Sequence, residues 1–337
     1  MRRRLLVLVS VVLCAGVSAC AGVTVAPVAT DEAAASPPPV PAAGGGHPID
    51  AGGGAQLSLL QQTGEAPIVQ FVAGATRTLD CEIYLVTDRD LAGALGAAAA
   101  RGVRVRVMLE TRAGSTALVK GERGVQVLPV PHVTLDHSKT CVRDAGTPAA
   151  AVLVGTANWS ASASTKNMDL VLTLPGTDPA AQQITQVVSA DAVEASAPAP
   201  PQQLGPGVAV ISPFNSRALL ATFIDQPGDR LLVTSEELRD PASVAALTRA
   251  AGSRRVDVAA PTTEKTPAGT HRCQSGLYIH GKVMVLWRSG QPALAFLGSE
   301  NLSTQSLDRN REIGVVEGAA LAAAIATALQ AVLTCPQ

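Results

Sequence analysis

The sequence predicts a mixed α/β fold built from two pseudo-symmetric lobes, each a mixed β-sheet flanked by helices and packed so that the lobes share one active site. Two observations lead to this prediction. A set of polar residues occurs twice at one constant offset, and a strand–helix–strand order occurs in both halves. Apolar β-branched runs that alternate with helical periodicity are typical of sheets covered by helices. Hydrophobic residues make up 47% of the chain, which provides ample material for a buried core.

The polar set reads HSK, GTAN and NMD in the first half, and HGK, GSEN and NRE in the second half. Lysine follows histidine after 2 residues, asparagine after 21 and the acid after 32 in both copies, and the whole set moves by 143 residues (280 − 137). Two copies that keep their polar residues while the apolar residues between them change indicate an internal duplication with paired sites. The two sets are His137, Lys139, Asn158 and Asp169, and His280, Lys282, Asn301 and Glu312.

The first half alternates strands and helices. Residues 81–86 are rich in apolar and β-branched side chains and predict a strand. Residues 90–100 predict a helix, because Leu91 and Leu95 share one face and Gly102 follows as a stop. Further strands are expected at 103–109, at 125–130, at His137, at 151–154 and at 170–174.

A polar helix at 180–190 and the Pro-rich residues 197–201 separate the halves, and the same alternation then begins again. Helices are expected at 217–224 and 241–251, strands at 231–235 and 256–260, and a closing helix at 319–333. The second polar set is expected on strands 278–286, 293–297 and 313–316.

The amino-terminal residues predict export. Three arginines precede an apolar run that is too short to span a membrane comfortably, and the run ends in Val-Ser-Ala-Cys, which resembles a bacterial lipobox. We therefore expect a lipoprotein signal peptide at 1–19 and lipid attachment at Cys20, with ordinary secretion as the alternative. Residues 20–55 predict a flexible Ala/Pro/Gly tether, followed by the repeats at 56–195 and 196–337.

Four cysteines remain after the expected cleavage: Cys81, Cys141, Cys273 and Cys335. An even number in an exported protein predicts two disulfide bonds, and three connectivities are possible. We favour Cys81–Cys141 with Cys273–Cys335, because each bond then stays inside one half; free buried thiols are the alternative. No CxxC pair is present to indicate a zinc site.

The paired set resembles the signature of the phospholipase D superfamily, HxKx4D followed by GxxN or GSxN. The first copy fits in full, since four residues separate Lys139 from Asp144. The second copy departs from the signature, because Trp287 stands where the aspartate is expected. The resemblance covers nearly everything after about residue 56. It implies a phosphodiesterase that works through a phosphohistidine intermediate and needs neither a metal nor another cofactor.

The resemblance also assigns roles. His137 would attack phosphorus and His280 would act as acid and base, although the two roles could be reversed. Asp169 and Glu312 would each accept the second ring proton of a histidine. The remaining members of the set, which would hold the phosphate oxygens, are Lys139, Lys282, Asn158 and Asn301.

Neighbouring residues are open to two interpretations each. Thr156 and Ser299 either contact phosphate or are hydroxyls at strand ends, and Trp159 lies either at the substrate mouth, which we favour, or in the core. Asp144 is expected to be a structural carboxylate, since seven residues separate it from His137 and strand alternation turns it to the opposite face. His132 and His271 precede the motifs in loops, where solvated histidines are common.

Composition bears on the substrate. The net charge is −1, with 26 basic and 27 acidic residues, and aromatic residues make up 2%. Neither a basic footprint nor stacking aromatics for nucleic acid is evident. The leading hypothesis is therefore a monomeric, lipid-anchored or secreted phosphodiesterase that cleaves phospholipid headgroups. The alternatives are an exported endonuclease, a phosphatidyltransferase resembling cardiolipin synthase, and an envelope phosphate-binding protein without turnover.

Overall fold

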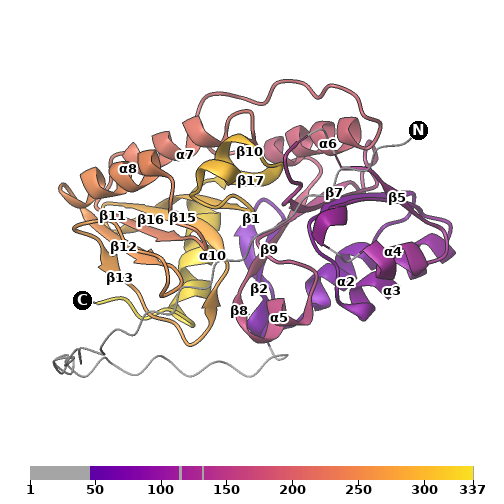
Figure 1. Ribbon diagram of the computed structural model, residues 1–337, viewed down its shortest axis with the longest axis horizontal. Helices are drawn as coiled ribbons and strands as arrows, with labels where there is room; N and C mark the ends of the chain where they lie inside the picture. The colour runs from indigo at the N-terminus through magenta and orange to yellow at the C-terminus, as the bar shows by residue number, and fades with distance from the viewer. Residues whose placement is uncertain (1–45, 114–115, 131–132, 337) are drawn as a thin grey trace, which may run out of the picture. The chain divides into compact units, whose positions relative to one another are not determined.

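The computed structural model describes residues 46–113, 116–130 and 133–336. Within them, two large mixed β-sheets are flanked by helices, which confirms the predicted α/β class (Figure 1). The predicted signal peptide, Cys20, His132 and most of the tether lie outside the described residues. In the part of the chain that the structure describes, no helix has the length and apolar character needed to cross a membrane.

The first sheet has eight strands among the described residues and runs from an antiparallel edge to a parallel edge. Its helices are α1 (Leu60–Thr63), α2 (Ala66–Ala73), α3 (Arg89–Ala100), α4 (Thr116–Gly121), α5 (Ala161–Thr165) and the 3₁₀ turn η1 (Thr111–Ala113). The strands, in sheet order, are β1 (Ile49–Gly52), β2 (Ala55–Leu59), β9 (Leu170–Pro175), β7 (Ala151–Gly155), β6 (Lys139–Arg143), β3 (Thr78–Ile83), β4 (Arg104–Leu109) and β5 (Val125–Leu128).

The second sheet has seven strands among the described residues. Helices α7 (Ser216–Asp225), α8 (Pro241–Ala251) and α9 (Thr304–Asp308) belong to this part of the chain. In sheet order the strands are β10 (Val208–Ser212), β17 (Glu312–Glu317), β16 (Gln291–Gly298), β15 (Lys282–Arg288), β11 (Arg230–Thr234), β12 (Arg255–Ala259) and β13 (His271–Arg272).

The two sheets share one topology. From β2 to β5 and from β10 to β13, four antiparallel pairings are followed by two parallel pairings in the same chain order. This agrees with a duplicated sequence. The twofold relation of the two lobes in space, and the repeat boundaries at 56–195 and 196–337, stay predictions.

Helices α6 (Pro179–Asp191) and α10 (Ala319–Gln330) contact strands of both sheets. The helix at α6 was expected to be polar, but its Ile184, Val187 and Val188 are buried in a core cluster that draws on both halves. Leu321 and Ile325 of α10 belong to the same cluster, and Figure 1 shows α10 beside β1 and β15. One apolar core therefore holds the two halves together.

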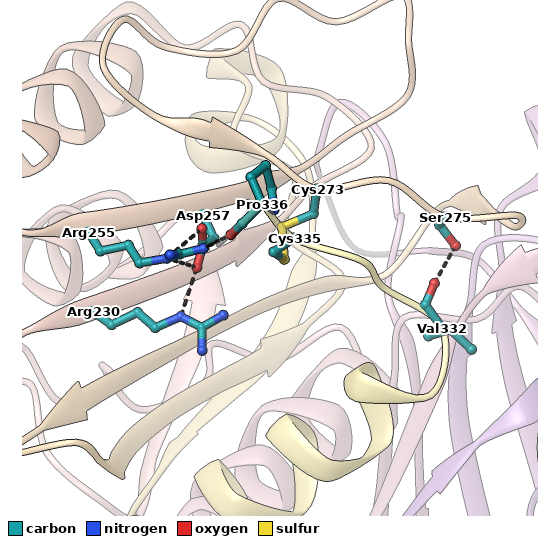
Figure 2. The surroundings of a disulfide bond; sticks show 8 residues. All are labelled: Arg230, Arg255, Asp257, Cys273, Ser275, Val332, Cys335 and Pro336. Carbon is teal, nitrogen blue, oxygen red and sulfur yellow. Dashed lines mark hydrogen bonds and ion pairs between the residues drawn. A yellow bond between two sulfur atoms is a disulfide. The ribbon is translucent and has the colours of Figure 1, made fainter. Parts of the chain in front are cut away.

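Both favoured disulfide bonds are present. Cys81 and Cys141 face each other across β3 and β6, and Cys273 is joined to Cys335 near the end of the chain. Figure 2 shows the second bond beside Asp257, whose carboxylate accepts hydrogen bonds from Arg230 and Arg255. Because the two sulfurs are bonded to each other and the carboxylate is paired, this group is a structural joint rather than a metal site.

Two boundaries differ from expectation. Strand β1 lies within residues 20–55, which were expected to be tether, because Ile49 and Asp50 pair with β2 at the sheet edge. The strand expected at 278–286 is broken into β14 (Tyr278–Ile279) and β15 at His280 and Gly281. The short β14 pairs instead with β8 (Asn167–Met168) of the first half, so its backbone hydrogen bonds cross between the repeats.

Candidate active site

His137 lies just before β6 and is oriented by the second repeat. Its Nδ1 lies 2.8 Å from Oε2 of Glu312, the first residue of β17. The other carboxylate oxygen of Glu312 accepts hydrogen bonds from Ser306 Oγ at 2.7 Å and Asn310 Nδ2 at 3.1 Å. The carboxylate is thus fixed on both sides, and Nε2 of His137 is left as the ring nitrogen that can react.

His280 is oriented in the reciprocal way. Its Nδ1 lies 2.7 Å from Oδ1 of Asp169, between β8 and β9 of the first repeat, and the same oxygen accepts a hydrogen bond from Thr156 Oγ1 at 2.6 Å. The predicted pairing of each histidine with an acid is therefore present, and each acid comes from the other repeat. Burial opposes ionisation of Asp169 and Glu312, but His280 and His137 respectively hold the pKa of these carboxyl groups below its usual range.

Backbone contacts brace this crossed arrangement. The N–H of His137 donates to the carbonyl of Arg311 at 2.9 Å, and the N–H of Gly281 donates to the carbonyl of Met168 at 2.7 Å. A Cβ at Gly281 would lie 2.9 Å from that same carbonyl oxygen, so the close approach requires glycine. Each HxK segment is thereby held against the acid-bearing segment of the other repeat.

Both motif lysines are buried, and each Nζ donates to the carbonyl of the histidine two residues earlier. Burial lowers the pKa of Lys139 to about 7, with a further contribution from the positive charge of Lys282. Burial likewise lowers the pKa of His137 to about 4, against the attraction of Glu312 and helped by the two lysines. His137 is therefore a neutral imidazole near neutral pH, as a nucleophile requires.

The two motif asparagines follow β7 and β16. Asn301 lines the cavity described below, and its Oδ1 accepts the N–H of Glu237 at 3.1 Å. Its NH2 group is therefore the end that an anion would use. Asn158 is half-buried, and its Oδ1 has no hydrogen-bond partner within the described residues.

Three residues for which a contact with substrate was considered face the interior. Thr156 is fully buried between Asp169 and the N–H of Leu170, which it accepts at 3.0 Å. Ser299 is also fully buried and accepts the N–H of Ile313 at 3.0 Å. Trp159 was expected at the mouth, but it is 1% exposed in a second apolar cluster, formed by residues of the first half alone. Its backbone is hydrogen-bonded to Leu85 and to Thr87, which holds it there. These side chains support the site from behind.

Asp144 is structural, as expected. Its buried carboxylate accepts backbone N–H groups of Thr76, Arg77 and Thr78 at 2.6–3.1 Å, which ties the start of β3 to the end of β6. In the second repeat the carbonyl of Trp287 accepts the N–H of Asp229, and the Asp229 carboxylate accepts the N–H of Gly290 at 2.6 Å. Asp229, directly before β11, thus joins the start of that strand to the turn between β15 and β16, where the motif aspartate is replaced.

A cavity of about 290 Å³ is lined by one residue of the first motif set and two of the second. Most of its acidic and aromatic lining was not predicted, although Tyr84 and Glu236 follow the ends of β3 and β11, where ligand sites of α/β sheets commonly lie. His271, by contrast, is exposed on edge strand β13 and does not line the cavity. The lining includes His137, Asn301 and Glu312 of the motifs, together with Tyr84, Glu236, Glu237, Glu264 and Tyr278.

Glu236 makes direct contact with the second motif. Its Oε2 lies 3.0 Å from Lys282 Nζ and 3.5 Å from His280 Nε2. Burial opposes its ionisation, but Lys282 and His280 lower the pKa of this carboxyl to about 2. A carboxylate therefore lies against the cationic groups that would hold a phosphate.

The comparisons with known proteins concern one domain of the chain and its fold. Residues 68–192 match the family described as cardiolipin synthase, PLD-like domain. Phosphatidylserine synthase from Haemophilus influenzae superposes with a TM-score of 0.60 at 12% identity, over 86% of this chain and 89% of that one. Polyphosphate kinase from Porphyromonas gingivalis gives a TM-score of 0.63 at 16% identity, over 78% of this chain.

The chain covers 44% of the length of the polyphosphate kinase, so the similarity concerns part of that enzyme. At these identities the similar structures show the fold. Among proteins of curated function, no sequence relative matches the chain.

Proposed function

We propose that the chain, whose residues 68–192 match a PLD-like domain, is a member of the phospholipase D superfamily and a phosphodiesterase that hydrolyses phospholipid headgroups. Members of this superfamily act on phosphodiester bonds. The observation that carries the proposal is the reciprocal pairing of His137 with Glu312 and of His280 with Asp169. Each pairing fixes Nδ1 and leaves Nε2 for chemistry.

In the first step, Nε2 of His137 attacks phosphorus, and the bond from phosphorus to the headgroup oxygen breaks. His280 gives its Nε2 proton to that oxygen, so the headgroup leaves as a neutral alcohol. In the second step His280 takes a proton from water, whose oxygen attacks phosphorus and breaks the bond to His137. The products are the headgroup alcohol and phosphatidic acid, and both histidines return to their starting protonation states.

The lysines and asparagines of the motifs act on the phosphate oxygens. Lys139 and Lys282 are buried, so their positive charge acts in surroundings of low dielectric constant and stabilises the pentavalent transition state. The amide of Asn301 is presented with its acceptor already occupied by protein, and Asn158 follows the equivalent strand.

The location that we propose for the protein favours a lipid as its substrate. We propose that the mature chain begins at Cys20 and is held at the outer face of the cell membrane by the lipid on that residue, with the Ala/Pro/Gly residues as a tether. Mass spectrometry of the mature protein should detect an acylated Cys20. An unmodified amino terminus at another residue would contradict the anchor.

The central test uses single substitutions. The mature protein is incubated in EDTA with phosphatidylcholine liposomes and, separately, with plasmid DNA. We expect headgroup release from the liposomes, and His137→Ala and His280→Ala should each reduce it by a factor of at least about 10³, because each removes one half of a two-step mechanism. Near-full activity of either variant would contradict a shared site. Plasmid nicking without headgroup release would identify an endonuclease instead.

A further inference from the structure

Glu236 lies where a bound phosphate is expected. Its Oε2 is 3.0 Å from Lys282 Nζ and 3.5 Å from His280 Nε2, and its Oε1 accepts a hydrogen bond from the Tyr278 hydroxyl at 3.1 Å. The side chain is 25% exposed, so it is held at the wall of the cavity rather than in the core. A phosphate that binds Lys282 competes with this carboxylate for the ammonium group.

The first repeat carries a different residue at the corresponding place. Asp88 caps α3 and Asp240 caps α8, and counting back four residues from each cap leads to Tyr84 and Glu236. The Tyr84 ring lies 4.8 Å from the His137 ring and 5.1 Å from Lys139 Nζ. The two sides of the site therefore differ in charge, with an uncharged ring beside His137 and a carboxylate beside His280.

The side near His280 is where the leaving group is expected, because His280 supplies its proton. The sequence contains two tyrosines, and both line this cavity. Glu264, which also lines it, is ion-paired with Arg239, whereas Glu236 takes its positive partners from the catalytic motif itself. Carboxylates and aromatic faces together are the surroundings that organic cations prefer.

Binding of a substrate would therefore change the ion-pair partners of Glu236. When the substrate phosphate binds Lys282, Glu236 has to share this cation with a second anion, and a weakly paired carboxylate in a half-buried place is costly. A positive charge on the leaving group can compensate for the weakened pairing. A neutral leaving group cannot, and a polyanion adds repulsion.

We propose that Glu236 is a specificity-determining residue that favours phosphodiesters whose leaving group carries a positive charge, such as an amino alcohol. The proposal rests on the proposed function and narrows its substrate class. Tyr278, whose side chain is exposed at the rim, supplies the aromatic face next to this carboxylate. Polynucleotides are disfavoured because their phosphates bring no cation to the site.

The test compares two short-chain phospholipids of equal acyl length, phosphatidylcholine and phosphatidylglycerol, by the release of choline or glycerol. We expect the wild type to favour the choline lipid in kcat/KM, and Glu236→Gln to reduce this preference about tenfold, mainly through KM for the choline lipid. Asp225→Asn removes an exposed carboxylate on α7 and should leave the preference unchanged. The melting temperature of each variant checks that it is folded.

The alternative outcomes separate the two proposals. An equal loss on both lipids would show that Glu236 positions Lys282 and His280, and an unchanged ratio would show that it has no part in selection; either result overturns the proposal. Release of neither headgroup by the wild type would overturn the proposed function instead. In that case calorimetric binding of phosphocholine and glycerol phosphate decides: a choline preference that Glu236→Gln abolishes supports the assignment, and equal affinities contradict it.

Discussion

The pH dependence of the site follows from two buried groups beside each other. His137 must be neutral to attack phosphorus, and burial lowers its pKa to about 4. Lys139 must be charged to hold phosphate, and burial lowers its pKa to about 7. We expect kcat/KM to rise as pH increases through about 4 and to fall as pH increases through about 7. Initial rates on a choline lipid across pH 3–9 give this profile, because kcat/KM reports the free enzyme.

A substitution tests the assignment of the alkaline limb. Arginine stays protonated throughout this range, so Lys139→Arg should move the loss of activity to higher pH, even if the larger group reduces the maximal rate. Lys166→Arg, in the turn after α5, is the matched control and should keep the wild-type profile. An alkaline limb that stays near pH 7 in Lys139→Arg would assign it to another group.

At the residue scale, the internal repeat identified the candidate site residues in the sequence. His137, His280 and their acids were predicted because both copies preserve them, and the structure brings each histidine to an acid. Glu236 was missed because its counterpart is Tyr84, and a comparison of repeats detects what the two copies share. Thr156 was placed ambiguously because a sequence does not show whether a hydroxyl at a strand end points outward or toward a buried acid.

At the element scale, Asp144 holds the sheet at the first motif. It accepts three backbone N–H groups, and charge-assisted hydrogen bonds contribute about 1.5–3 kcal/mol each at most. We expect Asp144→Ala to lower the free energy of unfolding by about 2–4 kcal/mol, partly because its φ of 51° also suits Asp or Asn better than Ala. Urea denaturation at pH 7 measures the loss.

The contribution of Asp144 to the free energy of unfolding depends on pH. Burial opposes its ionisation, but the backbone donors hold the pKa of Asp144 below its usual range. The contribution is therefore present above the unfolded pKa of about 3.9 and is lost as pH falls through the lower folded value. The difference between wild type and Asp144→Asn should shrink on acidification. A difference that is constant from pH 7 to pH 3 would contradict this role.

Most elements were predictable from local pattern. Helix α8 was expected at 241–251 and has those bounds, because Asp240 caps it and Pro241 begins it. The strand at 278–286 was predicted as continuous, since its residues are β-formers, but it breaks at His280 and Gly281 to pair with the other repeat. A long-range pairing of this kind leaves no mark in local periodicity.

At the scale of the whole molecule, the sequence showed a duplication but not how its halves meet. The disulfide bonds were predicted because each joins residues of one half. The burial of α6 was not, because its polar residues concealed the apolar face formed by Ile184 and Val188. Contacts between distant parts of the chain depend on both partners, and a single sequence does not specify which surfaces become partners.

The buried Arg311 makes several of these contacts between distant parts of the chain. It is 4% exposed, its guanidinium donates to Asp191 and to the carbonyl of Ser212, and it lies 4.0 Å from Glu82. Its own carbonyl accepts the N–H of His137. The side chain of Arg311 therefore links the second motif to α6 and β3, and its backbone carbonyl links it to the first motif.

Removal of Arg311 should leave buried carboxylates without their cation. We expect Arg311→Leu to lower the free energy of unfolding by about 3–5 kcal/mol at pH 8. Burial raises the pKa of Asp136 to about 7, and Arg311 opposes that rise. Below pH 7 Asp136 can protonate, so the loss should be smaller at pH 5. Arg249→Leu, at an exposed pair, should cost less than about 1 kcal/mol at either pH. Equal losses at both pH values would show that the charge of Arg311 is not what matters there.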